Sequence, residues 1–141
     1  MKINRHHFHM WIIFSVIFTI AALGLEIIEG YKITTTAYYG LKNAGVAIII
    51  FNFIFCMLIY PISFLPLTYI ANRYIKRYLI IKSIVYIIAG GLSGIWTFNK
   101  LYGYAEGSFI KGYNLNINTS IVLFSIAGLL YFLMDYKISK E

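Results

Sequence analysis

Four long uncharged stretches dominate the pattern of apolar and polar positions along the chain. The stretches contain 20, 30, 17 and 23 residues, and they follow Arg5, Lys42, Lys82 and Lys111 in turn. A helix that rises about 1.5 Å per residue needs about 20 residues to cross roughly 30 Å of hydrocarbon. The pattern therefore predicts an all-α integral membrane protein, a four-helix bundle made of two helical hairpins, with spans at approximately 9–29, 44–66, 80–99 and 116–135.

Composition supports this prediction. The 141-residue chain is 60% hydrophobic and 12% charged, whereas a typical soluble domain is about 25% charged. Its length suits a single transmembrane domain covering residues 1–141. A net charge of +7 would suit a nucleic-acid partner if the basic residues shared one soluble face. They stand instead at the ends of apolar runs, so the expected partner is the lipid bilayer and not a nucleic acid.

The basic residues also predict how the chain is threaded. The stretch 71–82 is expected to be a cytoplasmic turn, anchored by four cationic side chains: Arg73, Lys76, Arg77 and Lys82. This turn and the two termini carry eight Lys and Arg residues, against four in the loops at 30–42 and 99–118. Because cytoplasmic loops are enriched in Lys and Arg, both termini are expected in the cytoplasm. Lys82 and Lys100 border the shortest run and would have to extend to the interfaces.

The N-terminal region allows two interpretations. A basic start, an apolar run and the small residues at 22 and 24 resemble a cleavable signal peptide, but the run is long enough to stay as a helix with Trp11 as an interfacial anchor. We expect it to stay. His6, His7 and His9 are interpreted as anchors beside the membrane, because no cysteine or carboxylate follows closely to complete a metal site. No metal or other cofactor is therefore expected.

Glu26 and Glu29 are the candidate proton or cation site. They are three residues apart, and so lie on one helix face near the outer end of the first span. A carboxylate within a membrane needs a partner, a proton or an ion to offset its desolvation. Their place close to the far interface favours the alternative, in which both are ordinary interfacial charges.

Small residues in the third and fourth spans predict close helix packing. Gly90 and Gly94 have the GxxxG spacing that lets two helix backbones approach in lipid, and Gly128 offers a similar surface. We expect these residues to face one another within the bundle; the alternative is a seam between two copies. In the second span, Asn52 is expected to form an interhelical hydrogen bond.

Two prolines mark the inner part of the second span. Because proline has no backbone N–H and disfavours the preceding helical turn, Pro61 and Pro66 predict a kink or break after a helix from about 44 to 60. The prolines either simply end this helix or form a gating hinge.

Two segments carry a resemblance: Y-P-I-S-F-L-P-L-T-Y-I-A-N-R at the end of the second span, and S-I-A-G-L-L-Y-F-L-M-D-Y-K near the end of the chain. The chain resembles a family of small, uncharacterised four-span membrane proteins of Gram-positive bacteria. The resemblance implies a multi-pass protein of the bacterial plasma membrane and adds no activity.

The predicted function follows from what the sequence contains. The signatures H-E-x-x-H, G-x-S-x-G and the P-loop do not occur in it, so no enzyme is expected. We predict a non-enzymatic membrane protein that acts through helix or loop contacts with partners, either another membrane protein or further copies of itself. The alternative is a small transporter or channel subunit that uses Glu26 or Glu29 to couple protons or cations.

Overall fold

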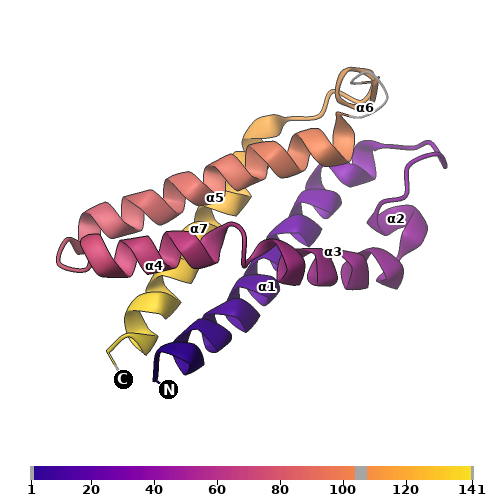
Figure 1. Ribbon diagram of the computed structural model, residues 1–141. Coiled ribbons are helices and arrows are strands. Elements are labelled where there is room, and N and C mark those ends of the chain that lie inside the picture. Colours follow the sequence, from indigo (N-terminus) through magenta and orange to yellow (C-terminus); the bar gives the residue numbers. More distant parts are fainter. Residues whose placement is uncertain (1, 104–107, 141) are drawn as a thin grey trace.

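The computed structural model of the protein describes residues 2–103 and 108–140, and all regular structure within them is helical (Figure 1). The longer helices are α1 (Lys2–Ile28), α3 (Val46–Ile59), α4 (Phe64–Tyr74), α5 (Leu79–Tyr102) and α7 (Ile117–Ile138). The short ones are η1 (Gly30–Lys32), α2 (Leu41–Ala44) and α6 (Ser108–Gly112). α1, α5 and α7 are each long and apolar enough to cross a membrane, and α3 with α4 makes a fourth span if the bent pair is counted as one. The prediction of an all-helical chain with several helices long and apolar enough to cross a membrane is confirmed.

Both termini lie at one end of the molecule, which we call the terminal end, and α2 and α6 lie at the other, the loop end (Figure 1). α1 packs against α7 and α3, and α5 packs along α7. The predicted loop at 99–118 includes α6, and its residues 104–107 lie outside the described part of the chain.

The closest helix pair is α5 with α7, and glycine makes it close. A Cβ atom added at Gly128 would overlap the carbonyl oxygen of Tyr86, and one added at Gly90 would overlap that of Phe124. At the next turn of α5, the Ser120 hydroxyl donates a 2.7 Å hydrogen bond to the Gly94 carbonyl. The structure thus places Gly90, Gly94 and Gly128 in one antiparallel contact within the chain, where only glycine lets the backbones meet.

A break divides the second predicted span. α3 ends at Ile59, α4 begins at Phe64, and their axes differ by 46°. Pro61 has no N–H to donate to the carbonyl four residues earlier, which belongs to Met57. The Trp11 indole N–H of α1 donates to that oxygen instead, at 2.8 Å. Trp11, expected as an interfacial anchor, therefore satisfies the carbonyl that the proline leaves free.

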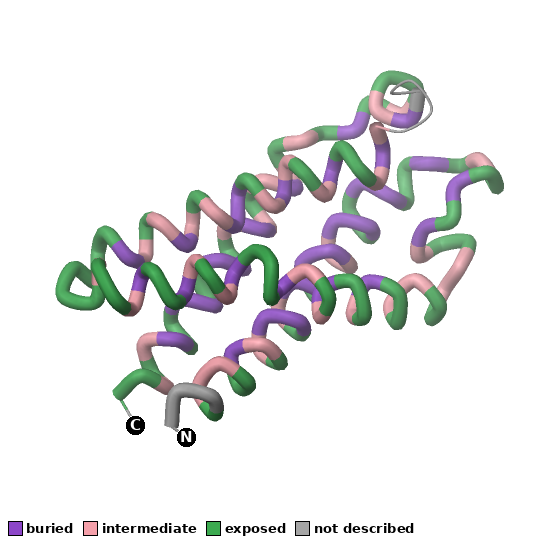
Figure 2. Tube along the Cα trace, viewed as in Figure 1, coloured by how far each residue is buried: buried purple, intermediate pink, exposed green. Residues whose placement is uncertain are grey.

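Aromatic side chains fill the space on which α4 packs. The Phe64 ring lies 4.8 Å from that of Phe14 and 5.3 Å from that of Tyr131, measured between centroids. The Tyr131 hydroxyl is 2.7 Å from the Thr68 hydroxyl, so α4 is tied to α7 by a buried polar contact as well. Many residues on the outward faces of the helices are exposed (Figure 2). A large share of them are apolar, which is compatible with contact with lipid.

The basic turn is shorter than the sequence suggested. We expected a turn over 71–82, but α4 continues to Tyr74 and α5 already begins at Leu79. Arg73 is in the last turn of α4, and the backbone N–H of Lys82 donates to the carbonyl of Tyr78. Charge marks where a segment leaves the apolar region, but it does not end a helix, because Lys and Arg are good helix formers.

Substituting Gly128→Ala should destabilise the α5–α7 pair, because the added methyl group meets the backbone of Tyr86. Overpacking of this kind costs about 1–3 kcal/mol, and thermal unfolding in detergent, followed by helical circular dichroism, measures it. Gly112→Ala is the control, because an added Cβ there meets nothing within 4 Å. Equal effects of the two substitutions would contradict the close contact.

Candidate functional site

The first predicted carboxylate, Glu26, is buried at the loop end with 1% of its surface exposed. Its Oε1 accepts hydrogen bonds from the hydroxyls of Tyr38 and Tyr102, the latter at 2.9 Å. Its Oε2 accepts from the backbone N–H of Leu41 at 3.1 Å. A Cβ at Gly40 would overlap this oxygen, so glycine allows the segment that precedes α2 to close over the carboxylate.

Glu29, also 1% exposed, contacts a different part of the loop end. Its Oε2 accepts from the Lys32 ammonium at 2.8 Å and from the backbone N–H of Asn116 at 3.0 Å. Its Oε1 accepts from the Thr119 hydroxyl at 2.7 Å. Glu29 therefore ties the end of α1 to the start of α7.

These contacts bear on the hypothesis of a proton or cation site. All four carboxylate oxygens of Glu26 and Glu29 accept hydrogen bonds from groups of the chain itself. Donors arranged in this way stabilise an ionised carboxylate without an added ion. The geometry favours a role in which the two glutamates hold the loop end together.

A second charged cluster lies at the terminal end, and the sequence did not predict it. Asp135 of α7 is completely buried, and Lys82 of α5 is 3% exposed. The Lys82 ammonium lies 2.5 Å from Asp135 Oδ2 as an ion pair and donates to Asn72 Oδ1 of α4, also at 2.5 Å. Lys82 therefore does not extend to an interface as expected, because a buried carboxylate lies within its reach.

His6 and Asn72 complete the cluster around the other oxygen of Asp135. His6 Nε2 lies 2.9 Å from Oδ1, and the Asn72 amide donates to the same oxygen over 3.4 Å. One carboxylate thus joins α1, α4, α5 and α7, which come from the start, the middle and the end of the chain.

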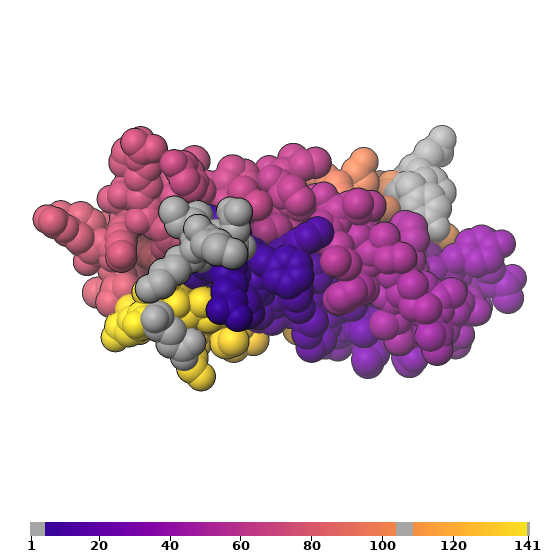
Figure 3. Space-filling view, turned by 60° about the horizontal axis from the view of Figure 1, so that its bottom comes forward, coloured from indigo at the N-terminus to yellow at the C-terminus, as the bar shows by residue number. Residues whose placement is uncertain are grey.

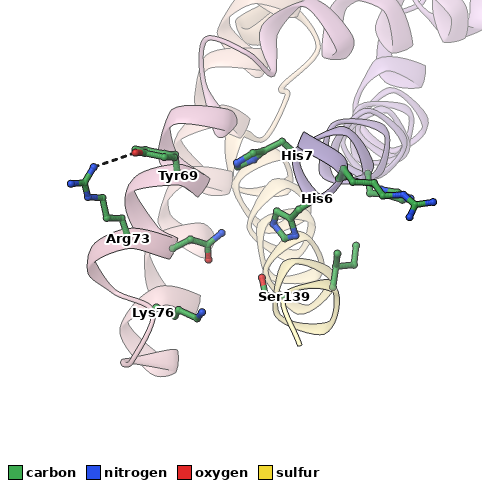
Figure 4. Close-up of a pocket in the computed structure, with 10 residues that line it drawn as sticks. His6, His7, Tyr69, Arg73, Lys76 and Ser139 are labelled. Carbon is green, nitrogen blue, oxygen red and sulfur yellow. Dashed lines mark hydrogen bonds between the residues drawn. The ribbon is translucent and has the colours of Figure 1, made fainter. Parts of the chain in front are cut away.

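A basic cavity of about 950 Å³ opens beside this cluster. We define the basic cavity by its lining, which brings six basic side chains together with four others: Arg5, His6, His7, His9, Arg73, Lys76, Tyr69, Asn72, Ile138 and Ser139. His6 and His7 come from α1, and Lys76 extends toward them from the turn after α4, whereas the Arg73 side chain is directed to Tyr69, away from the two histidines (Figure 4). The space-filling view shows the N-terminal part of α1 between the end of α7 and the α3–α4 segment (Figure 3).

The predicted anchor residues divide between three environments. Arg73 and Lys76 line the basic cavity, whereas Arg77 is exposed outside its lining and Lys82 is buried. The Arg73 guanidinium group donates a 3.2 Å hydrogen bond to the hydroxyl of Tyr69, one turn earlier in α4 (Figure 4). The four residues therefore do not act as one uniform anchor.

The spacing of charged residues and glycines in the sequence indicates the pairing of Lys82 with Asp135. Lys82 precedes Gly90 by eight residues, and Asp135 follows Gly128 by seven. In an antiparallel pair of helices that meet at these glycines, the two charges therefore reach the same level. The sequence analysis predicted the contact at the glycines but not this pairing of charges.

Comparisons with protein-family models, curated proteins and solved structures found no match to this chain. The resemblance to small four-span proteins of Gram-positive bacteria therefore stays a prediction. Within the described residues no group of three or more His, Cys, Asp or Glu side chains is arranged to hold a metal ion. The site must be interpreted from its own geometry.

Breaking the Lys82–Asp135 pair should destabilise the protein strongly. Lys82→Met or Asp135→Leu alone leaves an unpaired buried charge, at a cost of about 3–5 kcal/mol. The double variant removes both charges and should regain much of that loss. Unfolding midpoints in detergent of the wild-type protein, the two single variants and the double variant measure the coupling between Lys82 and Asp135. Losses of stability that add up in the double variant would contradict a direct pair.

Glu26→Ala and Glu29→Ala should loosen different segments, and each serves as the control for the other. Losing a hydrogen bond to a charged group costs about 1.5–3 kcal/mol, which corresponds to about tenfold or more in local opening. Glu26→Ala should speed amide hydrogen exchange in residues 38–44, and Glu29→Ala should do so in 115–120. The same pattern in both variants would argue against separate roles.

Proposed function

We propose that this chain is a non-enzymatic, four-span protein of the bacterial plasma membrane that binds a phosphate-bearing anion in its basic cavity. In this proposal the helices form a bundle and both termini face the cytoplasm. The observation that carries the proposal is the convergence of basic side chains from α1 and from the end of α4, two segments more than 60 residues apart, on one cavity.

Charge argues for an anionic ligand. Arg5, Arg73 and Lys76 supply the cationic groups of the cavity lining. Asp135, which contacts the cavity-lining His6 and Asn72, is already paired with Lys82. Arg5, Arg73 and Lys76 around one opening make a local positive potential that an anion reduces.

Position argues for a phosphate group near a membrane surface. The cavity lies at the ends of α1, α4 and α7, where apolar helices give way to charged residues. Arginine binds phosphate through several parallel hydrogen bonds, and basic clusters beside membrane helices attract acidic headgroups. Either an acidic phospholipid or a soluble phosphate ester presents this group.

Binding would also have a structural consequence. His6 and Asn72 both line the cavity and both contact Asp135. An anion held between α1 and α4 would therefore press these two helices onto the charged cluster. In the predicted function through partner contacts, the basic cavity would be the contact surface and a phosphate group the feature that it recognises.

The Arg73→Gln/Lys76→Gln double variant should lose anion binding. In nanodiscs of phosphatidylcholine, saturating glycerol phosphate or added phosphatidylglycerol should raise the unfolding temperature of the wild-type protein. A ligand at 100 times its dissociation constant stabilises by about 2.7 kcal/mol, and the double variant should lose most of this gain. The two additives distinguish a soluble source of phosphate from a lipid source.

The matched control is Arg77→Gln/Lys137→Gln, which removes the same charge from exposed positions outside the cavity lining. It should keep the wild-type response. Equal losses in the two double variants would indicate a general effect of net charge, and no response of the wild-type protein to either additive would refute the proposal.

A further inference from the structure

A second cavity, of about 520 Å³, opens between α3 and α5. We call it the lateral cavity; its lining is mostly apolar and includes Phe14 and Phe18 of α1. α3 and α4 meet at a 46° bend, and the rings of Phe55 and Trp96 stack between α3 and α5 with centroids 5.8 Å apart. Leu92, which also lines the cavity, is 61% exposed. The opening therefore faces the apolar flank of the molecule.

Asn52 brings an unused hydrogen-bond donor to this cavity. The side chain lines the cavity and is 8% exposed, and within the described residues its amide nitrogen has no hydrogen-bond partner. The expected interhelical hydrogen bond is thus not formed by this nitrogen. A buried donor without an acceptor costs about 1–3 kcal/mol, so the site has a place for an acceptor atom from outside the chain.

Lys100 gives the same cavity a positive charge at its loop end. It lines the cavity, is exposed, and lies two residues before the end of α5. Its ammonium is 6.0 Å from the centre of the Trp96 ring. Lysine beside tryptophan at the end of an apolar helix is typical of contact with lipid headgroups.

We infer that the lateral cavity binds one acidic phospholipid. Its phosphate lies at Lys100, an ester carbonyl accepts a hydrogen bond from the Asn52 amide, and an acyl chain fills the apolar space beside the Phe55–Trp96 stack. The volume is in the usual range for a ligand site, about 300–1,000 Å³. A lipid fits better than a soluble ligand because the opening lies on the apolar flank and not at either end.

The test uses delipidated full-length protein in detergent, with dioleoylphosphatidylglycerol or dioleoylphosphatidylcholine added in known ratio. Native mass spectrometry counts bound lipids, and the alkylation rate of Cys56, the single cysteine, reports on the cavity that it lines. We expect preferential retention of one phosphatidylglycerol that persists in the Arg73→Gln/Lys76→Gln variant, and a severalfold slower alkylation of Cys56 when it is bound.

Two variants and one control locate the lipid. In the Arg73→Gln/Lys76→Gln background, which removes anion binding at the basic cavity, Lys100→Gln should reduce retention of phosphatidylglycerol severalfold, to the level of phosphatidylcholine. Asn52→Leu should weaken retention of both lipids in the same background. Lys111→Gln removes a charge at the loop end outside the cavity and should change neither readout. Because Lys100 is exposed, its substitution is informative even if Asn52→Leu fails to fold.

The result is independent of the basic cavity. Arg73→Gln/Lys76→Gln should leave the protection of Cys56 by phosphatidylglycerol unchanged, whether or not an anion binds at the terminal end. Equal retention of the two lipids, equal effects of Lys100→Gln and Lys111→Gln, or alkylation of Cys56 that phosphatidylglycerol does not slow would each overturn the inference.

Discussion

The buried ion pair between Lys82 and Asp135 is the interaction on which the arrangement of helices depends. A charge in apolar surroundings must be paired and hydrogen-bonded, because its desolvation is otherwise not offset. Asp135 forms an ion pair with Lys82 of α5, accepts a hydrogen bond from Asn72 of α4 and contacts His6 of α1. A single carboxylate therefore specifies which helices are neighbours at the terminal end.

The loop end follows the same rule with different partners. Glu26 accepts hydrogen bonds from a hydroxyl in the segment before α2, from the first backbone N–H of α2 and from a hydroxyl at the end of α5. Glu29 accepts hydrogen bonds from groups at the start of α7. Between the two ends, contact at Gly90 and Gly128 sets the register of α5 on α7. Helices in lipid gain little from hydrophobic association, so polar contacts at both ends and close packing in the middle together select one arrangement.

The sequence predicted the helices better than it predicted the polar clusters. Uncharged runs of sufficient length indicate membrane helices because water cannot solvate them, and Pro61 marked the break because a missing N–H has a local effect. The partners of Asp135 depend on contacts between residues more than 50 positions apart. Only the glycine spacing contains part of that information. Glu26 was recognised as unusual, but its donors Tyr38 and Tyr102 lie in different loop-end segments whose approach no sequence pattern specifies.

The bend at Pro61 accounts for the place of both cavities. A straight helix from 46 to 74 would keep one direction throughout. In the bent pair, α3 lies opposite α5 before the break, and α4 lies opposite the N-terminal end of α1 after it. The lateral cavity is lined by α3 and the residues that follow it, and the basic cavity by α4 and the residues that follow it. Trp11 stabilises the bend by bonding to Met57, and Phe64 and Thr68 hold α4 to the core beyond it. These fixed contacts on both sides favour a permanent bend over a hinge, so Pro61 can place two cavities without needing to move.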